Sequence, residues 1–64
     1  MSIIGNGLKR SIAAEHKAAD DYRMRADIAK RQGDLVTAKL YLHIAREEMV
    51  HAAEFRARFN RIMA

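Results

Sequence analysis

The sequence predicts an all-α fold, an antiparallel two-helix hairpin that dimerises into a four-helix bundle. Residues with high helix propensity dominate the 64-residue chain, which contains no proline. Apolar residues recur at alternating steps of three and four, the spacing of one helix face. This pattern is interrupted once, at residues 32–34 in the middle of the chain. Residues 1–64 are therefore interpreted as one domain made of two helices of similar length.

The first helix is expected from about Leu8 to Gln32, because Gly5-Asn6-Gly7 favours an irregular segment before it. Its apolar stripe contains a single charged residue, Glu15. The stripe consists of Leu8, Ile12, Glu15, Ala19, Tyr22, Ala26 and Ala29.

The turn is expected at residues 32–34. Gly33 suits the left-handed conformation that closes a helix, since it has no Cβ. Asp34 suits the N-cap of the next helix, because its carboxylate can accept a hydrogen bond from a free backbone N–H.

The second helix is expected from about Leu35 to Ile62, and its apolar stripe again contains one charged residue, Glu48. The stripe consists of Ala38, Tyr41, Ala45, Glu48, Ala52, Phe55, Phe59 and Ile62.

The turn sets which residues of the two helices lie opposite each other. When the chain folds back at residues 32–34, opposite residues have numbers that total 63 or 64. Glu15 then faces Glu48, and His51 lies one helical turn beyond Glu48. Glu47 points about 100° away from Glu48 and replaces it only if the register shifts by one residue.

A chain of this length buries too little surface for a large core of its own. A single hairpin also leaves one side of its apolar seam open. We therefore expect a homodimer with two-fold symmetry, closed into a four-helix bundle. Higher assemblies remain an open alternative.

Dimerisation would bring two copies each of Glu15, Glu48 and His51 to one place. Four carboxylates in an apolar bundle repel one another and lose hydration, whereas divalent cations turn this repulsion into attraction. The donor set suits Fe or Mn, admits Zn, and lacks the soft ligands that Cu(I) prefers. The sequence thus predicts a site for two metal ions per dimer.

Several residues occur at intervals found in a known family. They are Glu15, Tyr22, Gly33, Ala38, Ala45 and the segment EMVHA, Glu48 to Ala52. Together they resemble one helix pair of the rubrerythrin branch of the ferritin-like superfamily, over about residues 11–59.

The resemblance implies a half-ferritin-like hairpin with two Fe ions per dimer. Glu48 would bridge the metals, and Glu15 and His51 would be terminal ligands, so these three are the expected catalytic residues. Tyr22 and Tyr41 would be outer hydrogen-bond partners or sinks for an oxidising equivalent, although core packing is the simpler role for both. The implied activity is that of a ferroxidase or of an oxidoreductase that reduces O2 or H2O2.

The chain departs from that family's pattern in two ways. Rubrerythrins carry two such helix pairs and a cysteine-rich domain, whereas this sequence has one pair and no cysteine. The electron donor is therefore expected to be a separate, unknown molecule. A symmetric dimer also duplicates every ligand, so a glutamate found on only one pair has no counterpart, which argues against peroxidase-type chemistry.

Two other functions are compatible with the sequence. Twelve Lys and Arg against eight Asp and Glu give a net charge of +4, which would suit a non-catalytic helical dimer that binds nucleic acid or an acidic protein. The basic residues are scattered, which makes nucleic acid the weaker option. In the second alternative, the metal is structural and ties two hairpins together.

The remaining charged residues are expected to have surface roles, and the apolar content of the sequence bears on the cellular location of the protein. His16 and His43 are expected to be surface or boundary residues. Glu54 is expected to be solvated, with the lining of an iron entry route as the alternative. Arg56 is expected to be solvated or to dock an acidic partner. The apolar runs are well short of the roughly 18 residues that a membrane span needs. The N-terminal segment lacks the apolar run of a signal peptide. A cytoplasmic protein without membrane contact is therefore expected.

Overall fold

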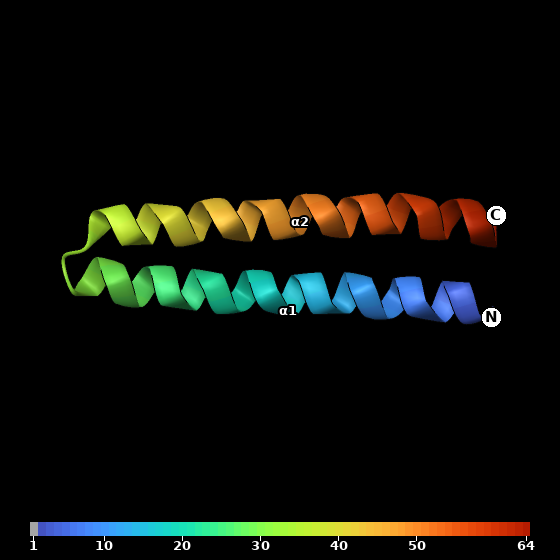
Figure 1. The fold of residues 1–64 in the computed structure, drawn as a ribbon, viewed down its shortest axis with the longest axis horizontal. Coiled ribbons are helices and arrows are strands. Elements are labelled where there is room, and N and C mark those ends of the chain that lie inside the picture. The colour runs from blue at the N-terminus through green and yellow to red at the C-terminus, as the bar shows by residue number, and fades with distance from the viewer. Residues whose placement is uncertain (1) are drawn as a thin grey trace.

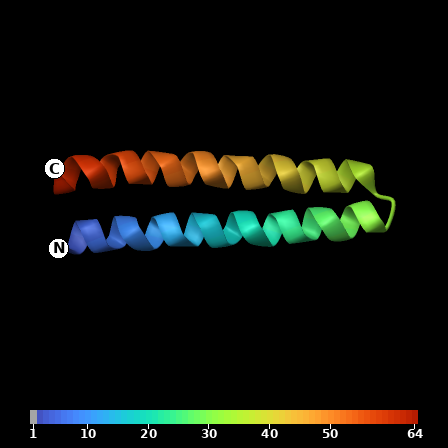
Figure 2. The same ribbon diagram turned by 180° about the vertical axis from the view of Figure 1, so that it is seen from behind.

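A computed structural model describes residues 2–64 as two α-helices joined by a short turn (Figure 1). Helix α1 spans Ile3–Arg31 and helix α2 spans Leu35–Met63. The helices are antiparallel, so both termini lie at one end of a rod of 47 × 13 × 11 Å (Figures 1 and 2). The predicted all-α hairpin is thus confirmed. Within the described residues, neither helix combines the length and apolar character needed to cross a bilayer.

Helix α1 begins earlier than the sequence suggested, and the expected start at Leu8 was wrong. Ser2 is the N-cap, and its Oγ accepts a hydrogen bond from the backbone N–H of Gly5 at 2.9 Å. Gly5 is itself buried in the helix. A glycine inside a helix costs only about 1 kcal/mol relative to alanine, so a cap and close packing can offset it. The other boundaries, Arg31 and Met63, lie within one residue of the expected ones.

The turn has the expected geometry. Gly33 has a φ of 80°, in the left-handed region that residues with a Cβ rarely adopt. Asp34 caps α2, since its Oδ1 accepts a hydrogen bond from the Thr37 backbone N–H at 2.9 Å. The Thr37 hydroxyl donates to Oδ2 of the same carboxylate at 2.6 Å. Both predictions for the turn are confirmed.

Asp34→Ala is expected to lower the thermal midpoint of unfolding, because α2 loses its cap. The Thr37 side-chain and backbone hydrogen bonds lower the pKa of Asp34. Its contribution is therefore present above the unfolded-state pKa and is lost as the pH falls through the lower folded-state pKa. Asp34→Asn keeps the acceptor but not the charge, so it should stay close to wild type and lack this acid dependence. Melting curves followed by circular dichroism across the acid range check both results, and an unchanged midpoint for Asp34→Ala would contradict the capping role.

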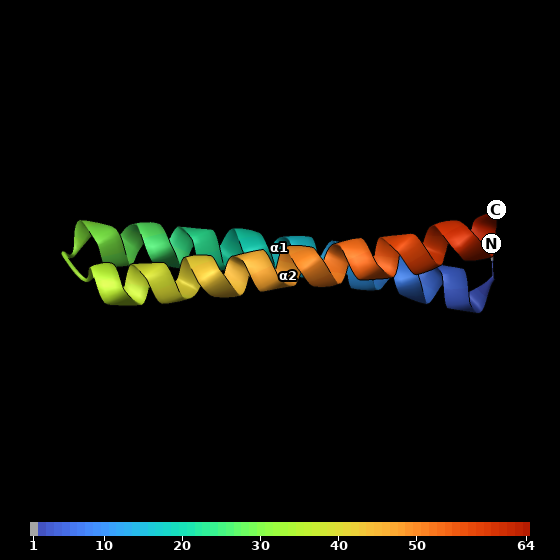
Figure 3. The same ribbon diagram turned by 90° about the horizontal axis from the view of Figure 1, so that it is seen from above.

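The core of the hairpin is a row of small residues at every seventh position. Ala19 and Ala45 are 0% and 2% exposed, and the register places them opposite each other. Short side chains let the helix backbones come close, and the two helices cross at a shallow angle (Figure 3). No large side chain is fully buried among residues 2–64. The buried row consists of Gly5, Ile12, Ala19 and Ala26 on α1 and Ala38, Ala45 and Ala52 on α2.

The buried row separates two sides of the hairpin with different chemistry. Residues three positions after a buried residue project to one side, and those four positions after it project to the other. We call the first the glutamate side; it carries Leu8, Glu15, Tyr22, Ala29, Tyr41, Glu48 and Phe55, together with Ile62 seven positions after Phe55, all partly exposed. We call the second the arginine side; it carries Lys9, His16, Arg23, Lys30, Leu42, Met49 and Arg56.

Candidate metal centre

The structure brings Glu15, Glu48 and His51 together on the glutamate side. Glu15 lies three positions after buried Ile12 on α1, and Glu48 lies three positions after buried Ala45 on α2. The turn register sets both at one level of the rod. His51 follows Glu48 by one turn of α2 and therefore lies beside it. We call these three residues the carboxylate cluster.

The distances within the carboxylate cluster suit a shared cation. His51 Nδ1 lies 3.7 Å from Glu15 Oε2 and 3.8 Å from Glu48 Oε1. One ligand atom from each of the three residues lies within 4.8 Å of the other two. A metal about 2.0–2.2 Å from each donor separates those donors by roughly 3 to 4 Å. The cluster therefore has room for a metal and is too open for hydrogen bonds from His51.

One oxygen of the cluster is closed off from solvent without a partner. Glu15 Oε2 is buried, and no hydrogen bond to it is formed among residues 2–64. The side chains of Glu15 and Glu48 are only 20% and 22% exposed, whereas His51 is 50% exposed. A buried carboxylate oxygen without a partner is costly in a folded protein. A cation at this point would satisfy it, so the residues present fit a metal.

The neighbouring Glu15 carboxylate raises the cost of ionising Glu48. The pKa of Glu48 is raised mainly because it can share a hydrogen bond with Glu15 when one of them is protonated. Loss of hydration and the negative charge of Glu15 raise it further, and His51 opposes the shift. In the absence of a cation, ionisation of Glu48 therefore costs more free energy in the folded chain than in the unfolded one.

Glu48→Gln is expected to raise the unfolding midpoint of metal-free protein at neutral pH. Because the folded-state pKa of Glu48 is above the unfolded value, its favourable contribution is present below the unfolded pKa and lost as the pH rises through the folded one. Glutamine does not ionise, so the advantage of the variant should grow as the pH rises from the unfolded-state pKa of glutamate, about 4.3, through the higher folded-state pKa of Glu48. Melting curves in the presence of a chelator measure this advantage.

The matched control is Glu54→Gln, which removes the same charge from an exposed position of α2. It should show no such pH-dependent gain. An advantage of Glu48→Gln that shrinks toward neutral pH would contradict the repulsion between the two carboxylates.

The neighbouring titratable residues are directed elsewhere. Glu47 Oε1 lies 3.3 Å from His43 Nε2, and both side chains are more than half exposed. His16 is exposed on the opposite side of the hairpin. Tyr22 and Tyr41 stack with ring centroids 5.9 Å apart, as the predicted register requires of two residues whose numbers total 63. They lie two helical turns, about 10 Å, from the carboxylate cluster, so their suggested roles toward a metal stay predictions.

The sequence favoured a solvated role for Glu54, with the lining of an iron entry route as the alternative. In the structure, Glu54 and Phe55 line a hollow of about 350 Å³ together with Glu15 and His51. Glu54 lies three positions after His51, and this spacing was the available signal that both reach one surface. The hollow gives the carboxylate cluster an opening with an acidic residue at its edge.

Comparison with known proteins agrees with this geometry. The family profile described as Rubrerythrin matches residues 6–63, which include Glu15, Glu48 and His51. No curated protein and no solved structure matches the chain. The match covers most of the chain, and the carboxylate cluster provides a group that can hold a metal. The chain therefore belongs to the rubrerythrin family of the ferritin-like superfamily, which indicates a di-iron carboxylate fold.

Proposed function

We propose that two copies of this chain form a di-iron oxidoreductase that oxidises ferrous iron or reduces O2 or H2O2. The observation that carries the proposal is the carboxylate cluster, in which Glu15 Oε2 is buried without a partner. Three donors from one hairpin are too few for two metal ions. A second copy related by two-fold symmetry doubles them to four Glu and two His, the donor set of di-iron carboxylate bundles.

The hairpin itself supports dimerisation on the glutamate side. Its buried core is Ile12 and five alanines, which is little apolar area for independent stability. The larger apolar side chains of the glutamate side, such as Phe55 and Ile62, are only partly buried in one copy. A second copy would cover them and close the carboxylate cluster from water.

In this proposal, each residue of the cluster has a distinct task. Glu48 would be the ligand shared by the two ions, and Glu15 and His51 would be the terminal ligands. A metal competes with protons for the Glu48 carboxylate, whose pKa is raised, so binding should weaken as the pH falls. When bound, two ferrous ions would supply one electron each for the reduction of O2 or H2O2. Tyr22 and Tyr41 form an aromatic layer beside the site and limit access of water from the turn end.

The test is anaerobic loading with ferrous iron, followed by measurement of iron per chain and of mass in solution. Absorbance is then recorded when air is admitted. We expect about one iron per chain, a dimer, and a new near-ultraviolet band after air. A well-folded dimer that takes up no iron would overturn the proposal.

A structural metal is the second candidate, favoured by the small alanine core. In that case the metal mainly ties two hairpins into a stable dimer. Zinc would then support the dimer as well as iron does, and iron-loaded protein would not react with oxygen. Repeated oxidation of added ferrous iron by catalytic amounts of protein distinguishes the enzyme from this candidate.

A further inference from the structure

The arginine side of the hairpin contains an open groove directly behind the carboxylate cluster. Two overlapping hollows of about 250 and 220 Å³ share Ile12, His16 and Arg56 as lining residues. The remaining lining residues are Lys9, Ala13, Met49, Ala52 and Ala53. The floor is thus apolar, and the charged groups at its edges are all basic.

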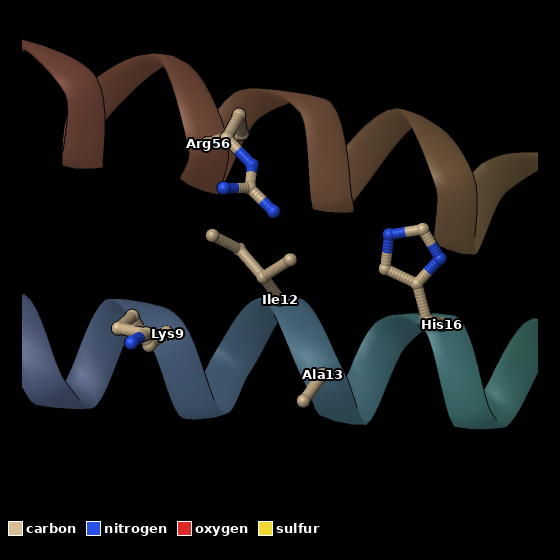
Figure 4. A pocket seen from close by; sticks show the side chains of 5 residues that line it. All are labelled: Lys9, Ile12, Ala13, His16 and Arg56. Carbon is tan, nitrogen blue, oxygen red and sulfur yellow. The ribbon is translucent and has the colours of Figure 1, made fainter.

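The basic side chains converge on this groove from both helices. Figure 4 shows the Arg56 guanidinium reaching from α2 toward α1 above Ile12, while the His16 ring rises from α1. Lys9 lines the same hollow one turn before Ile12 on α1. The groove therefore presents donors from two helices across one apolar surface.

These donors have no acidic partner within the hairpin. None of Lys9, His16 and Arg56 takes part in an ion pair among residues 2–64, and no carboxylate lines either hollow. By contrast, Arg23, farther along the same side, is paired with Asp20 at 3.0 Å. The groove is thus a local region of uncompensated positive charge.

The geometry points to a binding site for a small organic anion, with its phosphate or carboxylate head group between Lys9 and Arg56 and a short apolar body on Ile12. A guanidinium binds such head groups through two parallel N–H donors, and Lys9 adds a second positive charge. His16 offers an N–H donor in either protonation state. The apolar floor distinguishes this ligand from a free inorganic ion.

The groove stays available in the proposed dimer. His16 and Arg56 lie four positions after buried Ile12 and Ala52, whereas the carboxylate cluster lies on the opposite side. A second copy that covers the glutamate side therefore leaves the groove open. The anion site needs no residue of the carboxylate cluster and is independent of the proposed function.

The experiment titrates metal-free protein with n-butyl phosphate, inorganic phosphate and butanol, followed by NMR of backbone amides and of the Arg56 Nε–H. We expect shifts confined to residues around Lys9, His16 and Arg56. Butyl phosphate should bind about tenfold more tightly than inorganic phosphate because its chain covers the apolar floor, and butanol should not bind measurably.

The double variant Lys9→Gln/Arg56→Gln should weaken butyl phosphate binding by at least about tenfold. Lys17→Gln/Arg61→Gln removes the same charge from residues that line neither hollow, and should bind as wild type does. Circular dichroism verifies that both variants are helical. Equal affinity for phosphate and butyl phosphate, or equal weakening in both double variants, would overturn the site, as would shifts centred on Glu15 and His51.

Discussion

Replacing Glu48 or His51 with alanine is expected to reduce iron content from about one per chain to almost none. In the proposed site, each change removes a direct donor, and should weaken binding by more than the 10- to 100-fold that loss of an outer hydrogen-bond partner typically costs. Glu48 Oε1 and His51 Nδ1 lie 3.8 Å apart, so one cation can contact both. Iron is measured after anaerobic loading and desalting.

Glu47 and His43 provide matched controls on the same helix. They form an exposed pair 3.3 Å apart that faces away from the carboxylate cluster. Glu47→Ala and His43→Ala should therefore keep their iron. If Glu48→Ala or His51→Ala retained full iron content, the assignment of ligands would be wrong, and loss of iron in Glu47→Ala would indicate a register shifted by one residue.

Ala19→Leu is expected to produce the largest loss of stability in the hairpin. Ala19 is fully buried opposite Ala45, so three added carbons must push the helices apart. Overpacking of this kind costs about 1–3 kcal/mol. In a domain of this size, this corresponds to a fall of roughly 5–20 °C in the unfolding midpoint.

Ala57→Leu is the control, because Ala57 is exposed on α2 and the added side chain has open space. It should melt within a few degrees of wild type. Circular dichroism melts of metal-free protein, at several concentrations to separate folding from association, measure both variants. Equal midpoints for the two would show that the helices are not closely packed at Ala19.

The arrangement of the hairpin was largely predictable because one periodic pattern controls it. Glycine at position 33 fixed the turn, and the turn fixed the meeting of Tyr22 with Tyr41 and of Glu15 with Glu48. The start of α1 was not predictable from propensity, because the Ser2 cap and the burial of Gly5 outweigh local preference.

Other properties of the site depend on three-dimensional detail. Whether Glu15 Oε2 would be shielded from water depends on how closely the helices approach, which no spacing rule provides. The hollow beside Glu54 likewise arises from the shapes of side chains on both helices. The second copy is inferred from the open apolar seam of one hairpin, so the symmetric metal site stays a proposal.

The row of small residues along the seam also bears on how this sequence can change over generations. Almost every substitution at Ala19, Ala26, Ala38 or Ala45 enlarges the side chain, whereas most outward positions have open space. Harmful mutations should therefore recur with a period of seven residues. Between those positions, outside the carboxylate cluster and the turn at Gly33 and Asp34, the chain is free to diverge. Descendants of this protein would then keep alanines at seven-residue intervals after most of their sequence identity to it has been lost.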